Sequence, residues 1–278
     1  MSFSTILAPI EAGDVARAPF QAALRLAKRF GAKLDVLSYA AAPTAALTGG
    51  VLSVGAIDET LEARRGVAAA TLQEASQAAE KAGVEYEASL MASPLISLQE
   101  AVAQRALFAD LIVAPRLEKS GGDRGNVIHG ALFHGPTPLL VWPPELASEA
   151  ADRVGGNVLI AWDGRKPASA ATRLATPILS KAQAITILCV ERGFSDASPE
   201  EGPGEAFADW LKRRGIAASL RVVEEADIAE TISDSARELG ADLIVMGGYG
   251  HSQMMEAIFG GVTETMLRSA PAPLFMAH

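Results

Sequence analysis

The chain has 278 residues, of which 49% are hydrophobic and 21% charged, and its formal net charge is −9. This composition is typical of a globular protein, and at about 150 residues per domain the length predicts two domains. An acidic chain without a block of Lys and Arg lacks the basic face of most nucleic-acid binders, so we expect no nucleic-acid partner. The single cysteine, Cys189, excludes an internal disulfide framework and a Cys-based zinc ribbon.

The sequence favours a cytoplasmic protein with no membrane contact. Its first residues lack the basic and apolar regions of a signal peptide. The uncharged stretch 36–57 contains Pro43, Gly49, Gly50 and Gly55, and it is too weakly apolar to predict a membrane span.

In chain order, the first half opens with an apolar strand pattern at residues 5–11, followed by an Ala- and Leu-rich helical pattern. A second strand is predicted over 34–38 and a helix over about 61–82. Between them, residues 40–57 carry no charged side chain. This segment predicts either a flexible surface loop or a flap that packs on a partner subunit, because an apolar loop is costly to leave in water.

The second half alternates strands and helices in the same way. Its predicted strands are 157–162, 184–190, 217–223, 243–246 and 274–276, and its predicted helices are 167–180, 205–214, 227–239 and 261–269. The strands are nearly continuous apolar runs, which is typical of a parallel sheet covered on both faces. We therefore predict an α/β fold with an open, doubly wound parallel sheet of about five strands in each half.

An internal repeat divides the chain. The sequence Ala-Asp-Leu-Ile-Val occurs at 109–113 and again at 241–245, residues 5–11 resemble 158–164, and residues 136–142 match 271–277. These landmarks recur in the same order, so we predict two homologous domains, 1–147 and 154–278, joined by a polar linker. We expect the last strands, 139–142 and 274–276, to pair across a pseudo-twofold axis, which makes the chain a dimer-like unit.

Glycines cluster after the predicted strand 243–246. Gly247, Gly248 and Gly250 allow sharp turns and a close approach of the backbone to a phosphate. Gly260 and Gly261 lead into a helix whose first amides suit an anion. These clusters predict a polyphosphate clamp, or alternatively only tight turns and a helix start.

The spacing Gly247-x-x-Gly250, nine residues, then Gly260 resembles the nucleotide-binding motif of the universal stress protein family, here in a tandem form. The resemblance implies the adenine-nucleotide α-hydrolase-like fold and a site for ATP or AMP, with Mg²⁺ accompanying ATP. It places adenine between Ala161, Val190 and Met246, and assigns Asp163 to the adenosine end. It places the phosphates on the amides of Gly247, Gly250, Gly260, Gly261 and Val262.

One position departs from the family motif. The family has Ser or Thr after the third glycine, where this chain has Gly261, and Thr263 lies two residues further on. A hydroxyl bonded to a charged phosphate contributes roughly 1.5–3 kcal/mol, so its loss predicts weaker binding unless Thr263 replaces it.

The first half departs further. Residues 114–116 read Ala-Pro-Arg, so Gly247 and Gly250 have no counterparts, and Asp163 is matched by Ile10 or, with a one-residue slip, by Glu11. We expect this half to have lost nucleotide binding. Residues 121–126 either hold a different anion through Arg124 or form a solvated loop.

The resemblance implies a stress-response regulator that responds to an adenine nucleotide and acts on an unidentified protein partner, and a homodimer of whole chains stays open. Two alternatives are a ligand-free interaction scaffold and a slow ATP-hydrolysing or adenylyl-transfer enzyme. No nucleophile–base pair or zinc-ligand spacing is evident, so we assign no catalytic or metal-binding residues. Residues 246–263 contain neither Lys nor Arg, which argues against fast phosphoryl transfer.

Overall fold

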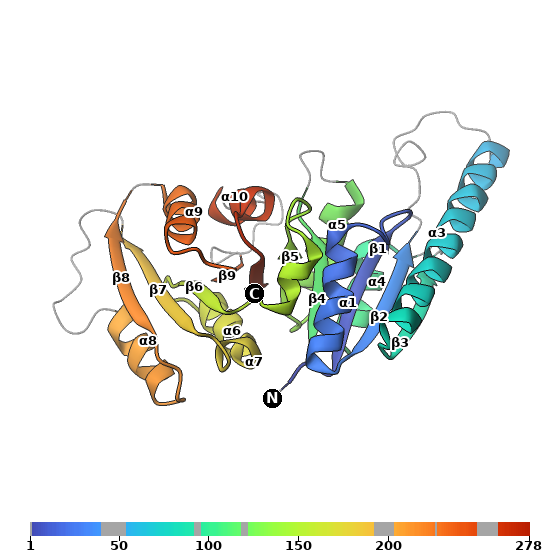
Figure 1. The fold of residues 1–278 in the computed structure, drawn as a ribbon. Coiled ribbons are helices and arrows are strands. Elements are labelled where there is room, and N and C mark those ends of the chain that lie inside the picture. The colour runs from blue at the N-terminus through green and yellow to red at the C-terminus, as the bar shows by residue number, and fades with distance from the viewer. Residues whose placement is uncertain are drawn as a thin grey trace.

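The computed structural model describes residues 2–39, 54–91, 96–117, 122–191, 203–225, 227–248 and 261–278. The two halves of the chain lie side by side, each with strands and helices in alternation (Figure 1). The first half contains β1 (Thr5–Glu11), α1 (Ala18–Phe30), β2 (Lys33–Tyr39), α3 (Val54–Ala82), β3 (Tyr86–Met91), α4 (Leu98–Ala106), β4 (Leu111–Pro115), α5 (Gly122–Phe133) and β5 (Leu139–Trp142). The second half contains η1 (Ser148–Asp152), β6 (Asn157–Ala161), α6 (Lys166–Leu174), α7 (Thr176–Leu179), β7 (Ala184–Glu191), α8 (Pro203–Lys212), β8 (Ser219–Glu224), α9 (Ile228–Glu238), β9 (Leu243–Gly247), α10 (Gly261–Ser269) and β10 (Leu274–Ala277).

All ten of these strands form one continuous sheet in the order β3-β2-β1-β4-β5-β10-β9-β6-β7-β8. Strands within each half are parallel, whereas β5 and β10 pair antiparallel at the centre, with Leu140 opposite Phe275. From either edge inward, the strands follow the equivalent order, β3-β2-β1-β4-β5 in the first half and β8-β7-β6-β9-β10 in the second. A pseudo-twofold axis between β5 and β10 requires this equivalence. The predicted α/β class and the predicted pairing of the last strands are confirmed.

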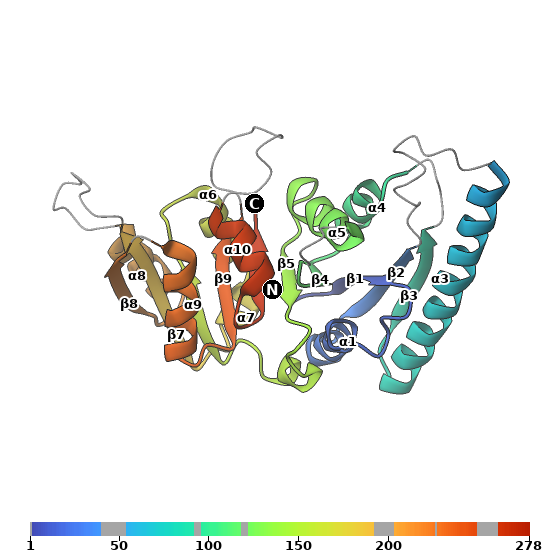
Figure 2. The same ribbon diagram turned by 90° about the horizontal axis from the view of Figure 1, so that it is seen from above.

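Helices cover both faces of this sheet (Figure 2). Neighbouring strand residues point to opposite faces, so Ile6 enters one apolar cluster and Leu7 the other. One cluster lies under α1, α3, α6, α7 and α8, and the other under α4, α5, α9 and α10. This burial on both faces accounts for the continuous apolar strand sequences.

The repeated aspartate has a structural role in each half. Asp110 accepts hydrogen bonds from the backbone N–H groups of Ser4 and Thr5, at 2.7 and 3.0 Å. Asp242 accepts from the N–H groups of Gly155, Gly156 and Asn157, at 2.7 to 3.2 Å. Each carboxylate therefore ties the start of one strand to the start of its neighbour.

The pairing register relates the two halves residue by residue. Ile6 lies opposite Leu111 in the first half, and Val158 lies opposite Leu243 in the second, within the repeated sequence. The correspondence at the carboxyl ends of the strands is Glu11 with Asp163, Tyr39 with Val190, and Pro115 with Gly247.

Two predicted elements differ from the structure. Helix α3 begins at Val54, so the last residues of the predicted loop 40–57 are helical, and residues 40–53 lie outside the described part of the chain. The helix predicted over 167–180 is two helices, α6 and α7, because Pro177 has no N–H to continue the hydrogen bonding of α6. Within the described ranges, no helix is long and apolar enough to cross a bilayer.

Candidate nucleotide-binding site

The three residues predicted to contact adenine lie on one face of the sheet, near the carboxyl ends of its strands. Ala161 on β6 pairs in register with Met246 on β9, and Val190 lies on the neighbouring strand β7. All three belong to the apolar cluster under α9 and α10, with Met246 buried and the other two partly exposed. They form an apolar floor of the kind that a planar base packs on.

Asp163 lies two residues beyond the end of β6, at the rim of this floor. Its side chain is exposed, and its Oδ1 accepts a hydrogen bond from the backbone N–H of Arg165 at 3.0 Å. This local bond orients the carboxylate without burying it. The carboxylate therefore remains open to hydroxyl or amino donors of a ligand.

The first turn of α10 faces the same strand ends. Val262 packs against the same apolar cluster as Ala161 and Val190, so α10 begins on the same face of the sheet as this floor. The backbone amides of Gly261, Val262 and Thr263 lie in the first turn, where amides have no partner within the helix. Gly261 is exposed and Thr263 is buried, so the first of these positions is the more accessible to a ligand.

Gly247 lies where β9 meets the first turn of α6. A Cβ atom at this position would lie 2.5 Å from the backbone nitrogen of Ala168 and 2.8 Å from the carbonyl carbon of Pro167. Packing therefore requires glycine here whether or not a phosphate binds, which supports the alternative that this glycine serves the fold. The backbone N–H of Gly248 donates a hydrogen bond to the carbonyl oxygen of Ala277, at 2.8 Å.

A second helix start lies at this edge, and the sequence predicted the helix over 167–180 without placing it at the site. The first turn of α6 touches Gly247 and carries the exposed cations Arg165 and Lys166 at its start. The sequence carried a signal for this helix start beside the site. Pro167 is typical of the first turn of a helix, and the two cations follow shortly after Asp163. Gly250 and Gly260, which the sequence singles out, lie outside the described residues.

The sequence model of the Universal stress protein family matches residues 156–278, the half that contains this site. A family member from Burkholderia pseudomallei is 31% identical over 43% of this chain and 92% of its own, with a TM-score of 0.32. The chain belongs to the universal stress protein family. Among curated proteins, no sequence matches this one.

Two solved structures share the fold of the whole chain. A universal stress protein from Archaeoglobus fulgidus superposes with a TM-score of 0.68 at 20% identity, over 98% of this chain and 97% of its own. A Pseudomonas aeruginosa protein described as a universal stress protein superposes with a TM-score of 0.64 at 16% identity, over 98% of this chain and 92% of its own. Other members of the family have been crystallised with cAMP and, in an Arabidopsis thaliana protein, with AMP.

The first half of this universal stress protein has different residues at the corresponding strand ends. The register makes Glu11, not Ile10, the counterpart of Asp163. Tyr39 replaces Val190 and is only 3% exposed. Its burial strongly raises the pKa of its phenol, and the negative charge of Glu11 raises it further. Pro115 replaces Gly247. At each of these three positions the first half therefore has a larger side chain than the second.

The proposed solvated loop at residues 121–126 is wrong for its described part. Residues 122–126 form the start of α5, and Arg124 is only 8% exposed. Its guanidinium lies 3.2 Å from Asp14 and 3.5 Å from Glu11, measured between nitrogen and oxygen. Two carboxylates already neutralise this cation, which argues against the other reading, an anion held by Arg124.

Proposed function

We propose that this universal stress protein binds an adenine nucleotide, ATP or AMP, in its second half and acts as a nucleotide-responsive regulator in a stress response. The observation that carries the proposal is the convergence of an apolar floor, an exposed carboxylate and the first turn of α10 at one edge of the sheet. Ligands of open α/β sheets bind at this edge, outside the carboxyl ends of the strands. The AMP and cAMP found in other family members support the choice of ligand.

Each part of the site would serve one part of the nucleotide. The base would pack on Ala161, Val190 and Met246, and Asp163 would accept hydrogen bonds from the adenosine end. The phosphates would lie on backbone amides at the glycine positions and the start of α10, which are Gly247, Gly250, Gly260, Gly261, Val262 and Thr263. Amides at a helix start favour an anion through both hydrogen bonds and the helix dipole. Mg²⁺ would accompany ATP as its counterion.

A regulator is favoured over an enzyme by the charges near the proposed phosphate position. Phosphoryl or adenylyl transfer needs cations that stabilise the developing charge. Residues 246–263 supply none, and Arg165 and Lys166 are exposed residues at the start of α6. A nucleotide that binds without turnover can change the conformation or the choice of protein partner.

The proposal is tested by calorimetric titration of ATP, AMP and adenosine into the wild-type protein and Asp163→Ala. We expect one nucleotide per chain and roughly tenfold weaker binding in the variant, since a hydrogen bond to a charged group contributes about 1.5 kcal/mol or more. The matched control is Asp209→Ala, an exposed aspartate on α8, which should bind as wild type does. A wild-type protein that binds no nucleotide would favour the scaffold, and release of phosphate or pyrophosphate would favour the enzyme.

A further inference from the structure

One short segment distinguishes the first half from the second at the carboxyl ends of the strands. Helix α1 begins seven residues after Glu11, whereas α6 begins three residues after Asp163, so the first half has four additional residues in this connection. Helix α5 contributes Arg124 to the same edge. Because β5 and β10 align through Leu139 and Leu274, Gly261 corresponds to residue 126, and Arg124 lies two positions before it.

The longer connection and the first turn of α5 contact each other. Asp14 lies in the connection and Arg124 lies in the first turn of α5. The Arg124 Nη2 lies 3.2 Å from the Asp14 Oδ2, and its Nε lies 3.5 Å from an oxygen of Glu11. The Asp14 Oδ1 is paired with Arg17, at 2.8 Å. The side chains of Arg124 and Asp14 are only 10% and 14% exposed, so this ion pair is buried, and Glu11, the counterpart of Asp163, lies beside it.

We propose that Arg124 is a built-in occupant of this strand-end site, a guanidinium bound by Glu11 and Asp14, so that the first half has a site built for a cation and not for the anionic group of a nucleotide. The guanidinium fork matches carboxylates better than an ammonium does, so the site selects guanidinium groups. Without Arg124, the group Glu11, Asp14, Asp123 and Arg17 carries more negative than positive charge and repels a phosphate. Burial raises the pKa of Asp123, which is consistent with the enclosed character of this cluster.

This proposal deepens the proposed function, because it explains why one half of the chain takes the nucleotide and the other does not. Only that consequence rests on nucleotide binding. The occupancy of the carboxylates by a guanidinium concerns the first half alone, so its test needs no nucleotide.

The test removes the occupant and supplies a substitute. Arg124→Ala should lower the melting temperature, and millimolar methylguanidinium should restore part of the loss. The same ligand should not stabilise the wild-type protein, whose site is filled by Arg124. It should also not stabilise Arg124→Ala/Asp14→Asn, whose site has lost one of its two carboxylates. Methylammonium, which has the charge without the fork, should restore less. Equal effects of methylguanidinium on all three proteins would overturn the proposal.

A second measurement covers the case in which Arg124→Ala does not fold. In the wild-type protein, the Nη2 hydrogens of Arg124, which donate to Asp14, should give a ¹⁵N-resolved NMR signal that is protected from exchange with water, and Asp14→Asn should abolish this protection. An unchanged signal in Asp14→Asn would overturn the proposal, as would a shift of the wild-type signal on titration of inorganic phosphate, because Arg124 would then be an anion ligand. Failure of ATP to bind the wild-type protein would instead count against the proposed function and leave this result intact.

Discussion

The two halves of the chain share a strand order but differ where a ligand would bind. At the carboxyl edge of the first half, Tyr39 and Arg124 are buried over the strand ends, and Pro115 ends β4. At the same edge of the second half, Val190 is smaller and Asp163 is exposed. A few side chains and one short difference in length therefore distinguish the strand ends of the two halves on one scaffold, and function depends on such local differences and not on the fold.

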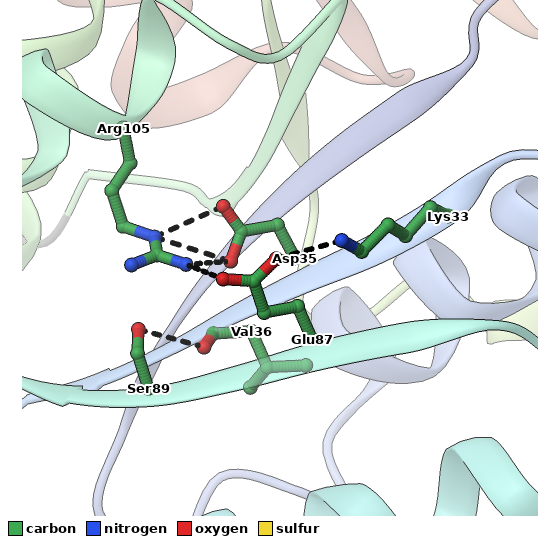
Figure 3. A network of polar contacts seen from close by, with 6 residues as sticks. All are labelled: Lys33, Asp35, Val36, Glu87, Ser89 and Arg105. Carbon is green, nitrogen blue, oxygen red and sulfur yellow. Dashed lines mark hydrogen bonds and ion pairs between the residues drawn. The ribbon is translucent and has the colours of Figure 1, made fainter.

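The halves also differ at the two outer edges of the sheet. In the first half, Arg105 on α4 makes a two-pronged hydrogen bond to Asp35, and Lys33 bonds Glu87 at 2.7 Å (Figure 3). Asp35 and Glu87 lie opposite each other on β2 and β3. In the second half, the register places Thr186 and Ser219 at these positions, and their hydroxyls are 3.3 Å apart. A charged network thus stands in one half where a neutral hydroxyl pair stands in the other.

The largest effect is expected from Arg105→Met, which would leave the carboxylate of Asp35 buried without its partner. Asp35 is 8% exposed, and its hydrogen bond raises the pKa of the Arg105 guanidinium. We expect urea unfolding to show a loss of about 3 kcal/mol, the low end for a broken buried pair. The control is Arg237→Met in the second half, whose exposed pair with Asp234 should contribute under about 0.5 kcal/mol. Equal losses in the two variants would refute the contrast between the halves.

A smaller loss of stability is expected from Gly247→Ala. The added Cβ would meet the backbone of Ala168 at 2.5 Å, so β9 and α6 must separate, at a cost of about 1–3 kcal/mol. In the matched control, Gly248→Ala, the nearest atom is the methyl carbon of Met276 at 3.5 Å, an ordinary contact. Thermal unfolding of both variants is the measurement. Similar melting temperatures would show that Gly247 is not required by packing.

Gly261→Ser should sharpen the proposed site. No atom lies within 4 Å of a Cβ at this position, so the substitution introduces no clash. If the added hydroxyl reaches the phosphates, ATP should bind roughly fivefold tighter, for about 1 kcal/mol, and adenosine should bind as before. Titration of both ligands into the same variant removes any general gain in helix stability from the serine. An equal change for ATP and adenosine would place the hydroxyl away from the phosphates.

The sequence predicted the fold in detail because its signals are local or repeated. Continuous apolar strands required cover on both faces, and the repeat containing Asp110 and Asp242 placed the halves in equivalent registers. The helix boundary before Pro177 was missed, since the pattern of apolar residues continues across it.

The sites were less predictable, because they depend on contacts between distant segments. The sequence could not choose between Ile10 and Glu11 as the counterpart of Asp163, and pairing with the neighbouring strands decides it. Nor could it place Arg124 on Asp14, which lies 110 residues earlier in the chain. A cation beside glycines is compatible with both a solvated loop and an anion site until the partner of the cation is known.

The smallest effect concerns the pH dependence of the exposed pair between Lys33 and Glu87. The hydrogen bond from Lys33 lowers the pKa of Glu87 below its ordinary value of 4.5. A carboxyl group with a lowered pKa stabilises the folded state above the pKa of the unfolded chain, and this contribution is lost as the pH falls through the folded value. Glu87→Gln should therefore melt slightly below wild type at neutral pH, and the difference should shrink toward zero in acid. It should also shrink in high salt, because the pair is exposed. The matched control at the corresponding position, Ser219→Ala, removes a neutral hydrogen bond, so its difference from wild type should not change with pH. A constant difference for Glu87→Gln across the acid range would show that the charged network of the first half does not act through its ionisation.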